Sequence, residues 1–199
     1  MAKTEDKASS AKKRSSLRET LTFTLGGIAV ALLVHAFVLQ SFYIPSESME
    51  NTLLINDRVV VNKLAYRFGD VKRGDIVVFK GWTGEDTIKR VIGVGGDVVK
   101  CCDAKRRITV NGTPLDEEGK YLYPGAYPSG RPFEVKVPAG RLWLMGDHRN
   151  NSQDSRYFME DGHYGTVSED DVIGRAFARY WPLSRLSFLS RPETFSAVH

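Results

Sequence analysis

Two serines stand one residue apart directly after a proline, in the segment Pro45-Ser46-Glu47-Ser48. A proline fixes its own φ and biases the residue before it toward extended backbone, so the segment should hold both hydroxyls in a defined conformation. A hydroxyl held in place is what a serine nucleophile requires. The same residue types dominate ordinary polar turns, and the segment alone does not separate these two interpretations.

A serine nucleophile needs a neighbouring base to accept its proton. His148 and His163 are candidates for a triad of the serine-histidine-carboxylate kind. The other kind of base is a lysine kept neutral by burial, because desolvation lowers the lysine pKa. Lys89 is the strongest such candidate, since it lies inside the apolar run 87–94, and Lys63 is the second. The alternative for Lys89 is a lysine on an edge strand whose amine reaches solvent.

A dense polar segment, residues 146–156, follows the apolar run 142–145. One interpretation is a solvated turn that carries surface ion pairs. However, a loop rich in small hydrogen-bonding groups and entered from a buried strand also suits residues that position a catalytic base.

The carboxy-terminal three quarters of the chain are predicted to be mainly β. Short runs of β-branched residues alternate with Gly-Asp turns. The predicted strands are residues 58–64, 75–79, 87–94, 97–100, 107–110, 133–137, 141–145 and 172–176. Residues 117–131 are expected to be a long surface excursion, and the tail 183–199 is left unassigned. The expected fold is an extracytoplasmic β-sheet or β-barrel-like domain over residues 44–182.

Residues 21–44 contain no Asp, Glu, Lys or Arg. At about 1.5 Å per residue, a helix of this length crosses a hydrocarbon core of about 30 Å, so residues 21–43 are predicted to be a single transmembrane anchor. His35 is interpreted as a tolerated polar residue within it. A cleaved secretory signal is the alternative, but the run is longer than such a signal's apolar region and no small-x-small cleavage site follows it.

The charge distribution predicts the orientation of this anchor. Residues 1–20 carry six basic and three acidic side chains, which accounts for most of the formal net charge of +4. A basic tail before the anchor predicts a cytoplasmic amino terminus, with everything after the anchor outside. The remaining body is nearly neutral, which argues against nucleic acid as a partner.

Cys101 and Cys102 are adjacent. Their Cα atoms would lie about 3.8 Å apart across a trans peptide, which is shorter than the roughly 4.4 Å lower limit of ordinary disulfides. Only a strained vicinal bridge could join them, so two thiols are expected instead, and two cysteines alone do not make a zinc site.

Four segments in this order behind one membrane segment resemble bacterial type I signal peptidase, the membrane-anchored serine endopeptidase of peptidase family S26. The segments are Ile44-Pro45-Ser46-Glu47-Ser48-Met49, Arg73-Gly74-Asp75-Ile76-Val77-Val78-Phe79, Ile88-Lys89-Arg90-Val91-Ile92-Gly93, and Gly146-Asp147 with Asp154-Ser155-Arg156.

The resemblance implies a serine/lysine dyad, with Ser48 as nucleophile and Lys89 as general base. Ser46 matches the family's side-chain donor to the oxyanion, which acts together with the backbone N–H of Ser48. Ser152 matches the residue that hydrogen-bonds and orients the lysine. The positions of a surrounding structural ion-pair group are Asp147, Arg90, Asp154 and Arg156.

Three departures from the family pattern stand near these positions, although none falls on the dyad. Asn51 replaces a common proline, residues 94–96 replace a frequent Leu-Pro-Gly, and His148 and Asn150 interrupt the usual Asn-Arg-Asp. His148 is the departure most expected to alter the pH behaviour.

The implied function is removal of signal peptides from exported preproteins at small-x-small cleavage sites, on the outer side of a bacterial plasma membrane. The implied partners are the preprotein, which pairs with the enzyme as an extended strand, and membrane lipid. Neither a metal nor an organic cofactor is implied. Two alternatives remain: a self-cleaving repressor-type serine/lysine peptidase, and a catalytically silent membrane-anchored peptide-binding protein.

Overall fold

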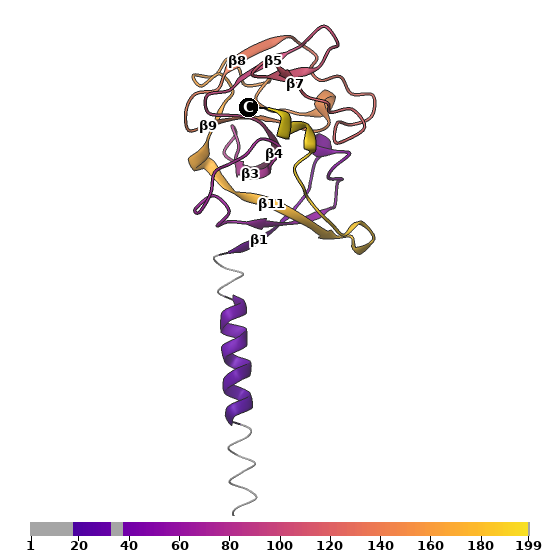
Figure 1. The fold of residues 1–199 in the computed structure, drawn as a ribbon. Coiled ribbons are helices and arrows are strands. Elements are labelled where there is room, and N and C mark those ends of the chain that lie inside the picture. Colours follow the sequence, from indigo (N-terminus) through magenta and orange to yellow (C-terminus); the bar gives the residue numbers. More distant parts are fainter. Residues whose placement is uncertain (1–17, 33–37, 199) are drawn as a thin grey trace, which may run out of the picture. The chain divides into compact units, whose positions relative to one another are not determined.

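The computed structural model describes residues 18–32 and 38–198 and separates the chain into two compact units, Met1–Leu39 and Gln40–His199 (Figure 1). The described part of the first unit includes a helix over residues 18–32 that exposes large apolar side chains, including Leu21, Phe23 and Leu25. None of the helices in the described ranges is both long enough and apolar enough to span a bilayer. His35 and residues 1–17 of the predicted tail lie outside these ranges.

The last part of the predicted anchor is a strand. Leu39–Tyr43 forms β1, which pairs with β2 (Arg58–Asn62), so the prediction of an anchor reaching residue 43 is wrong at this end. The physical reason is that these residues lack charge but not polarity. Ser41 Oγ lies 2.7 Å from Tyr180 Oη, within hydrogen-bonding distance. Tyr43 Oη donates to Asn56 Oδ1, and both contacts suit the edge of a sheet.

The second unit is mainly β, as predicted, and contains an eight-stranded sheet. Its strands follow the order β1-β2-β11-β3-β4-β9-β10, and β12 pairs with β11. Besides β1 and β2, the strands are β3 (Ile76–Lys80), β4 (Asp86–Val94), β9 (Arg141–Met145), β10 (Val167–Ser168), β11 (Val172–Trp181) and β12 (Ser187–Phe188). Because β3 and β4 are interior strands buried on both faces, they read as nearly continuous apolar runs.

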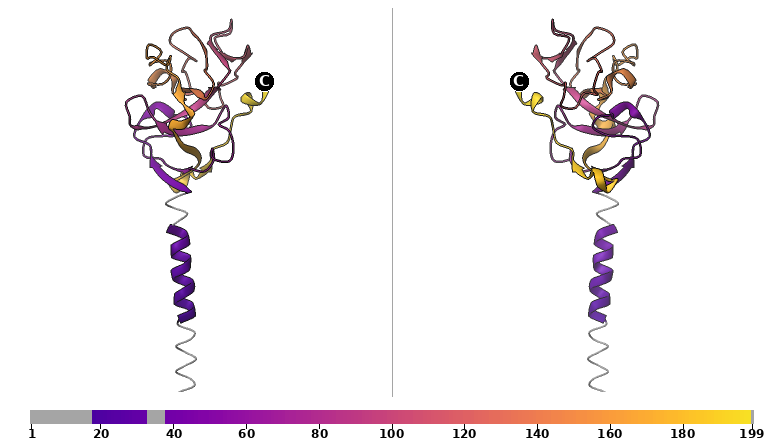
Figure 2. Two further views of the ribbon diagram at one scale, coloured as in Figure 1. Left: turned by 90° about the vertical axis from the view of Figure 1, so that its left-hand side faces the viewer. Right: turned by 90° about the vertical axis from the view of Figure 1, so that its right-hand side faces the viewer.

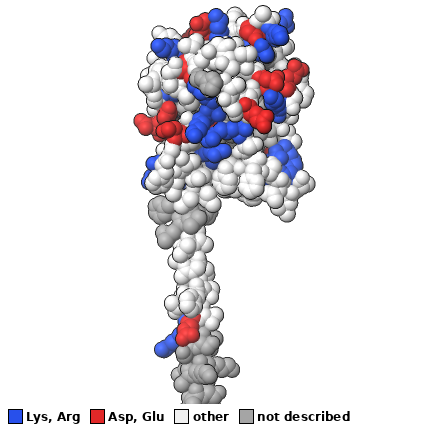
Figure 3. Space-filling view, viewed as in Figure 1, with Lys and Arg blue, Asp and Glu red and all other residues white. Residues whose placement is uncertain are grey.

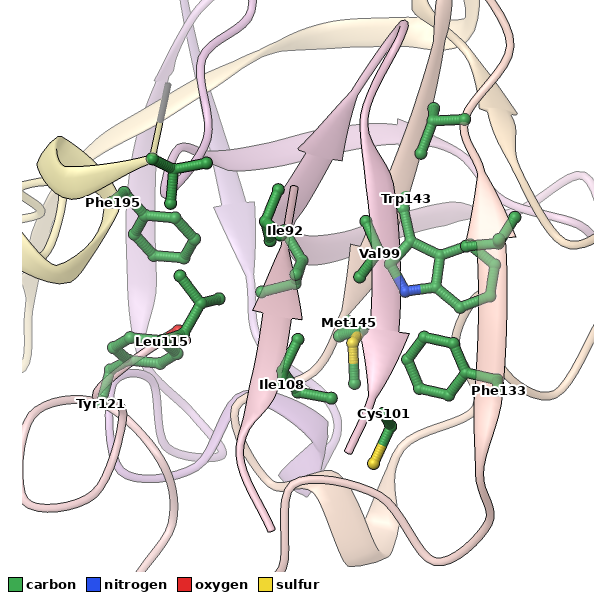
Figure 4. Close-up of a cluster of buried hydrophobic side chains, with 14 residues drawn as sticks. Ile92, Val99, Cys101, Ile108, Leu115, Tyr121, Phe133, Trp143, Met145 and Phe195 are labelled. Carbon is green, nitrogen blue, oxygen red and sulfur yellow. The ribbon is translucent and has the colours of Figure 1, made fainter. Parts of the chain in front are cut away.

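A four-stranded sheet lies at the end of this unit away from β1 and β11 (Figures 1 and 2). Its order is β7-β6-β5-β8, with β5 (Val98–Cys101), β6 (Ile108–Val110), β7 (Thr113–Pro114) and β8 (Phe133–Lys136). The apolar cluster under it includes Trp143, Phe133 and Met145, which lie side by side in Figure 4. The two sheets therefore share one core, to which β9 contributes from the larger sheet.

The eight predicted strands all occur, most with ends shifted by one or two residues. β11 runs five residues beyond its predicted end at 176, and β7, β10 and β12 were not predicted. The tail 183–199, predicted to lie outside the β domain, belongs to the second unit. It contains the 3₁₀ turns η4 (Leu183–Arg185) and η5 (Glu193–Ala197), and Phe195 and Val198 enter the core.

The segment 117–131 is only partly a surface excursion. Glu117, Tyr121 and Leu122 are buried in its first half, whereas every position from residue 123 onward is exposed or half-buried. Composition rich in Tyr, Pro and Gly predicted the irregular backbone but not the burial.

Cys101 and Cys102 form a vicinal disulfide, so the expectation of two thiols is wrong. That expectation assumed the Cα spacing of a trans peptide. The peptide between the two residues is cis, and their Cα atoms lie 3.0 Å apart.

Candidate active site

Ser48 lies in the 3₁₀ turn η1 (Glu47–Met49), which Ser46 precedes in extended backbone. The turn is fixed from both ends: Ile44 N–H donates to the carbonyl of Asp57, and the buried side chain of Met49 enters the core beneath the larger sheet. Ser48 itself is 7% exposed. The segment after Pro45 is therefore an ordered turn whose second serine points inward.

Lys89 meets this serine from β4. Its Nζ lies 2.7 Å from Ser48 Oγ, and the side chain is 4% exposed. β4 lies between β3 and β9, so Lys89 is not an edge-strand lysine whose amine reaches solvent. Within the described residues, no carboxylate forms an ion pair with Lys89.

Burial lowers the pKa of Lys89 from 10.5 to about 8. The charges of Asp154 and Asp147 oppose this shift, and the charge of Arg156 adds to it. A lysine amine with this pKa is neutral in an appreciable fraction of molecules near neutral pH, which a general base requires.

The two histidines do not take this position. His148 stacks its ring on Tyr123, with centroids 3.9 Å apart, and its Nδ1 lies 3.5 Å from Glu50 Oε2. His163 is exposed. In the described ranges, neither side chain hydrogen-bonds Ser48 Oγ. The backbone N–H of His148 does reach the serine, donating to the Ser48 carbonyl at 3.1 Å.

Arg90 and Asp147 form a buried ion pair beside the dyad. Arg90 Nη2 lies 2.7 Å from Asp147 Oδ2, with side chains 2% and 0% exposed. Arg90 also donates to the Gly74 carbonyl, and the hydroxyl of Thr52 donates to Asp147. Burial lowers the pKa of Arg90, but the charge and hydrogen bonds of Asp147 raise it by more. The net shift is upward, so the guanidinium stays charged.

Asp154 and Arg156 form a second buried pair, 2.8 Å apart. Asp154 also accepts from the backbone N–H of Gly146. Burial raises the pKa of Asp154, but the hydrogen bonds and charge of Arg156 outweigh it and the net shift is downward. This carboxylate stays ionised and fixes the entry to the polar loop.

Ser152 does not make the hydrogen bond to Lys89 that the family pattern implied. Its Oγ is buried and makes no hydrogen bond to Lys89 among the described groups, and its polar interaction is with Asp154, whose pKa it helps to lower. The side chain packs closely against Gly146, where even a Cβ atom would collide with Ser152 and with the Ser48 carbonyl. Ser152 thus lies beside the dyad without a polar contact to it.

Ser46 lies on the open side of the dyad. It is exposed, and its Oγ lies 3.2 Å from Ser48 Oγ. A groove of about 240 Å³ passes these hydroxyls, and its lining includes Ile44, Ile88 and Lys89. Two larger hollows, of about 570 and 700 Å³, include neither Ser48 nor Lys89 in their lining. The candidate site is therefore chosen by the contact between Ser48 and Lys89 and not by the size of the hollow.

One group of side chains in the described ranges has donor atoms spaced as in a cation site. Atoms of Glu47, Glu50 and His148 lie within 4.8 Å of one another. Glu47 is exposed and already accepts from Asn151. Glu47 and Glu50 flank Ser48 in the sequence.

Several residues around the site were not predicted. The Thr52 hydroxyl contacts both Arg90 and Asp147. Its position in the sequence, four residues after Ser48, does not predict these contacts. Asn51 has a φ of +83°, a conformation that proline cannot adopt because its ring holds φ near −65°. Its side chain donates to the Leu122 carbonyl, so this departure from the family pattern joins the serine turn to the segment 117–131.

A buried serine hydroxyl within hydrogen-bonding distance of a buried lysine of lowered pKa is the arrangement of a serine hydrolase that uses a lysine as its base. The family model described as signal peptidase, peptidase S26, matches residues 17–181. The chain belongs to this family.

Signal peptidases from several bacteria are similar to this chain over nearly its whole length. It is 39% identical to a probable signal peptidase I-2 of a Synechocystis species, over 94% of this chain and 86% of the relative. It is 39% identical to the signal peptidase I of Leptolyngbya laminosa, covering 94% and 91%, and 31% identical to a signal peptidase IB of Staphylococcus aureus, covering 90% and 97%. A crystal structure of a signal peptidase I from Enterococcus faecalis aligns with a TM-score of 0.42 at 25% identity, covering 54% of this chain and 97% of that one.

Proposed function

We propose that this protein removes signal peptides from exported preproteins, with Ser48 as nucleophile and Lys89 as general base. One observation carries the assignment of the two residues: Lys89 Nζ lies 2.7 Å from Ser48 Oγ, and both side chains are buried. Membership of the signal peptidase family supports the reaction and the kind of substrate.

The proposed reaction begins with neutral Lys89. Its amine accepts the Ser48 proton while Ser48 Oγ bonds to the scissile carbonyl carbon. The resulting ammonium then gives that proton to the leaving amine as the peptide bond breaks. Water, deprotonated by the same amine, attacks the acyl-enzyme, and the ammonium returns that proton to Ser48 Oγ as the acyl bond breaks. The proton count closes with Lys89 neutral again, so no cofactor is needed.

The oxyanion formed in this reaction needs hydrogen-bond donors. We assign that role to the hydroxyl of Ser46 and the backbone N–H of Ser48. Ser46 suits it because its hydroxyl is exposed beside the groove and 3.2 Å from the attacking oxygen. The backbone of Ser48 suits it because the turn η1 is anchored on both sides by Ile44 and Met49.

The substrate is expected to lie in the groove beside the dyad as an extended strand. The groove is small, at about 240 Å³, and apolar where Ile44, Val78 and Ile88 line it. Small side chains on either side of one residue fit such a space, which agrees with a small-x-small cleavage sequence.

We also propose that the first unit anchors the protein in the membrane, with the amino terminus in the cytoplasm and the β domain outside. The described helix supports this, since after Arg18 and Glu19 it presents only uncharged side chains (Figure 3). Because β1 begins at Leu39, the proposed anchor ends before that residue. A carboxy-terminal tag should be digested by protease added to spheroplasts, and a protected tag would contradict this orientation.

The proposed dyad is tested by cleavage of a purified preprotein with detergent-solubilised enzyme. Ser48→Ala and Lys89→Ala should lose cleavage while keeping the wild-type melting temperature within a few degrees. Lys63→Ala is the matched control, because Lys63 is the other candidate lysine and lies outside the groove. Wild-type cleavage by Ser48→Ala would show that the nucleophile is misassigned. Wild-type cleavage by Lys89→Ala, or loss of cleavage in the Lys63 variant alone, would show that the base is misassigned.

A further inference from the structure

A further buried ion pair joins the segment 117–131 to the polar loop. Arg149 Nη1 lies 3.0 Å from Glu117 Oε2, and its Nη2 donates to Glu117 Oε1. The two side chains are 0% and 3% exposed. Tyr121 donates its hydroxyl to the same carboxylate. Glu117 is therefore shielded from water and is held by partners on both sides.

The Arg149 side chain also closes the polar loop on itself. Its Nε donates to the Gly146 carbonyl at 2.9 Å, and its Nη1 reaches the Pro128 carbonyl at 3.2 Å. The Arg149 carbonyl in turn accepts from Arg156 at 2.9 Å. One guanidinium thus sets the path of residues 146–149.

That path determines how the loop meets the nucleophile. His148 N–H donates to the Ser48 carbonyl, and Gly146 approaches the same carbonyl so closely that no Cβ would fit. Holding this carbonyl fixes the backbone of Ser48 and with it the direction of the Cα–Cβ bond that carries Oγ toward Lys89.

We infer that Glu117 is a positioning residue for Ser48, acting through Arg149 and the loop 146–149; this inference rests on the proposed function. Without the carboxylate, the buried guanidinium loses its ion-pair partner and keeps only the more distant charge of Asp147, so it is expected to turn toward water. It then releases the Gly146 carbonyl, and the loop loses its fixed contact with Ser48. Glu117 touches neither the dyad nor the groove, so its effect is on geometry alone.

The first test is Glu117→Gln, measured with the full-length enzyme on a preprotein. A misplacement of about 1 Å costs roughly 10²-fold in rate, so kcat should fall by about that factor. KM should change little, because neither Glu117 nor Arg149 lines the groove. The pH midpoint of the reaction should stay where it is, because Lys89 keeps its own surroundings.

The second test separates positioning from simple stability. Glu117→Leu combined with Arg149→Met removes both charges and keeps the volume, which buried pairs often tolerate without loss of stability. A methionine side chain cannot donate to the Gly146 carbonyl. The double variant should therefore melt near the wild-type temperature and still show the reduced kcat. This variant also decides the matter if Glu117→Gln does not fold.

Asp97→Asn is the matched control. Asp97 is also a buried carboxylate paired with an arginine, Arg73. It lies at the turn between β4 and β5, and in the described part of the chain its side chain makes no hydrogen bond to the polar loop. It should lower the melting temperature and leave kcat unchanged well below that temperature.

The outcomes distinguish this inference from the proposed function. If the wild-type enzyme does not cleave, or if Ser48→Ala cleaves as well as wild type, the proposed function fails. If both behave as expected but the double variant recovers the wild-type kcat, the pair is purely structural and the inference is overturned. A wild-type kcat in Glu117→Gln would also overturn the inference.

Discussion

Lys89 and Arg90 are consecutive buried basic residues on β4, and their pKa values shift in opposite directions on the two faces of that strand. On one face, burial without an ion-pair partner lowers the pKa of Lys89 to about 8. On the other, the contacts with Asp147 outweigh burial and raise the pKa of Arg90. Strand alternation separates the two environments by a single residue. The difference indicates that an ion-pair partner, and not burial alone, decides the direction in which the pKa of a buried cation shifts.

The largest expected effect comes from removing the base without removing the charge. Lys89→Arg should lower kcat/KM by about 10⁴-fold, because a guanidinium stays protonated and accepts no proton. Arg90→Lys is the paired variant, and it should keep most of the activity because an ammonium still faces Asp147. Equal losses in the two variants would show that the faces of β4 are not functionally distinct.

Ser46→Ala tests a smaller contribution on the Lys89 face. Loss of one oxyanion donor typically lowers kcat by about 10² to 10³-fold. The enzyme should therefore be impaired but measurably active, with a wild-type pH midpoint. An unchanged kcat in a steady-state cleavage assay would remove Ser46 from the oxyanion site.

Arg90→Met tests the other face and should have the smallest effect on turnover. It leaves Asp147 buried without its charge partner, which typically costs about 3–5 kcal/mol of stability. Denaturant unfolding should show this loss. The folded fraction should keep more activity than either the Lys89 or the Ser46 variant, and a greater loss of kcat than in Ser46→Ala would make Arg90 part of the catalytic machinery.

The sequence located most of the β structure because interior strands need β-branched residues on both faces. Runs such as 75–79 and 87–94 therefore stand out from the Gly-Asp turns between them. A charged residue inside such a run is conspicuous, so the run marks Lys89 as a candidate base. β1 was misassigned because a count of charges does not distinguish an uncharged edge strand from the end of a membrane segment.

Contacts distant in sequence could not be predicted in this way. Glu117 meets Arg149 across 32 positions, and its neighbourhood, rich in Gly, Tyr and Pro, indicates only an irregular surface segment. The family pattern gave the positions in the polar loop but not their contacts, as Ser152 shows. Such contacts depend on the path of the folded backbone, which local composition does not set.

The pH dependence of kcat/KM tests the central claim most directly. Protonated Lys89 cannot accept the Ser48 proton, so activity must rise with pH as the amine loses its proton. Because burial lowers the pKa of Lys89 to about 8, kcat/KM should be half-maximal near that pH. A profile that is flat across this range, or that rises only as an unperturbed lysine titrates, would contradict the assignment of Lys89 as the base.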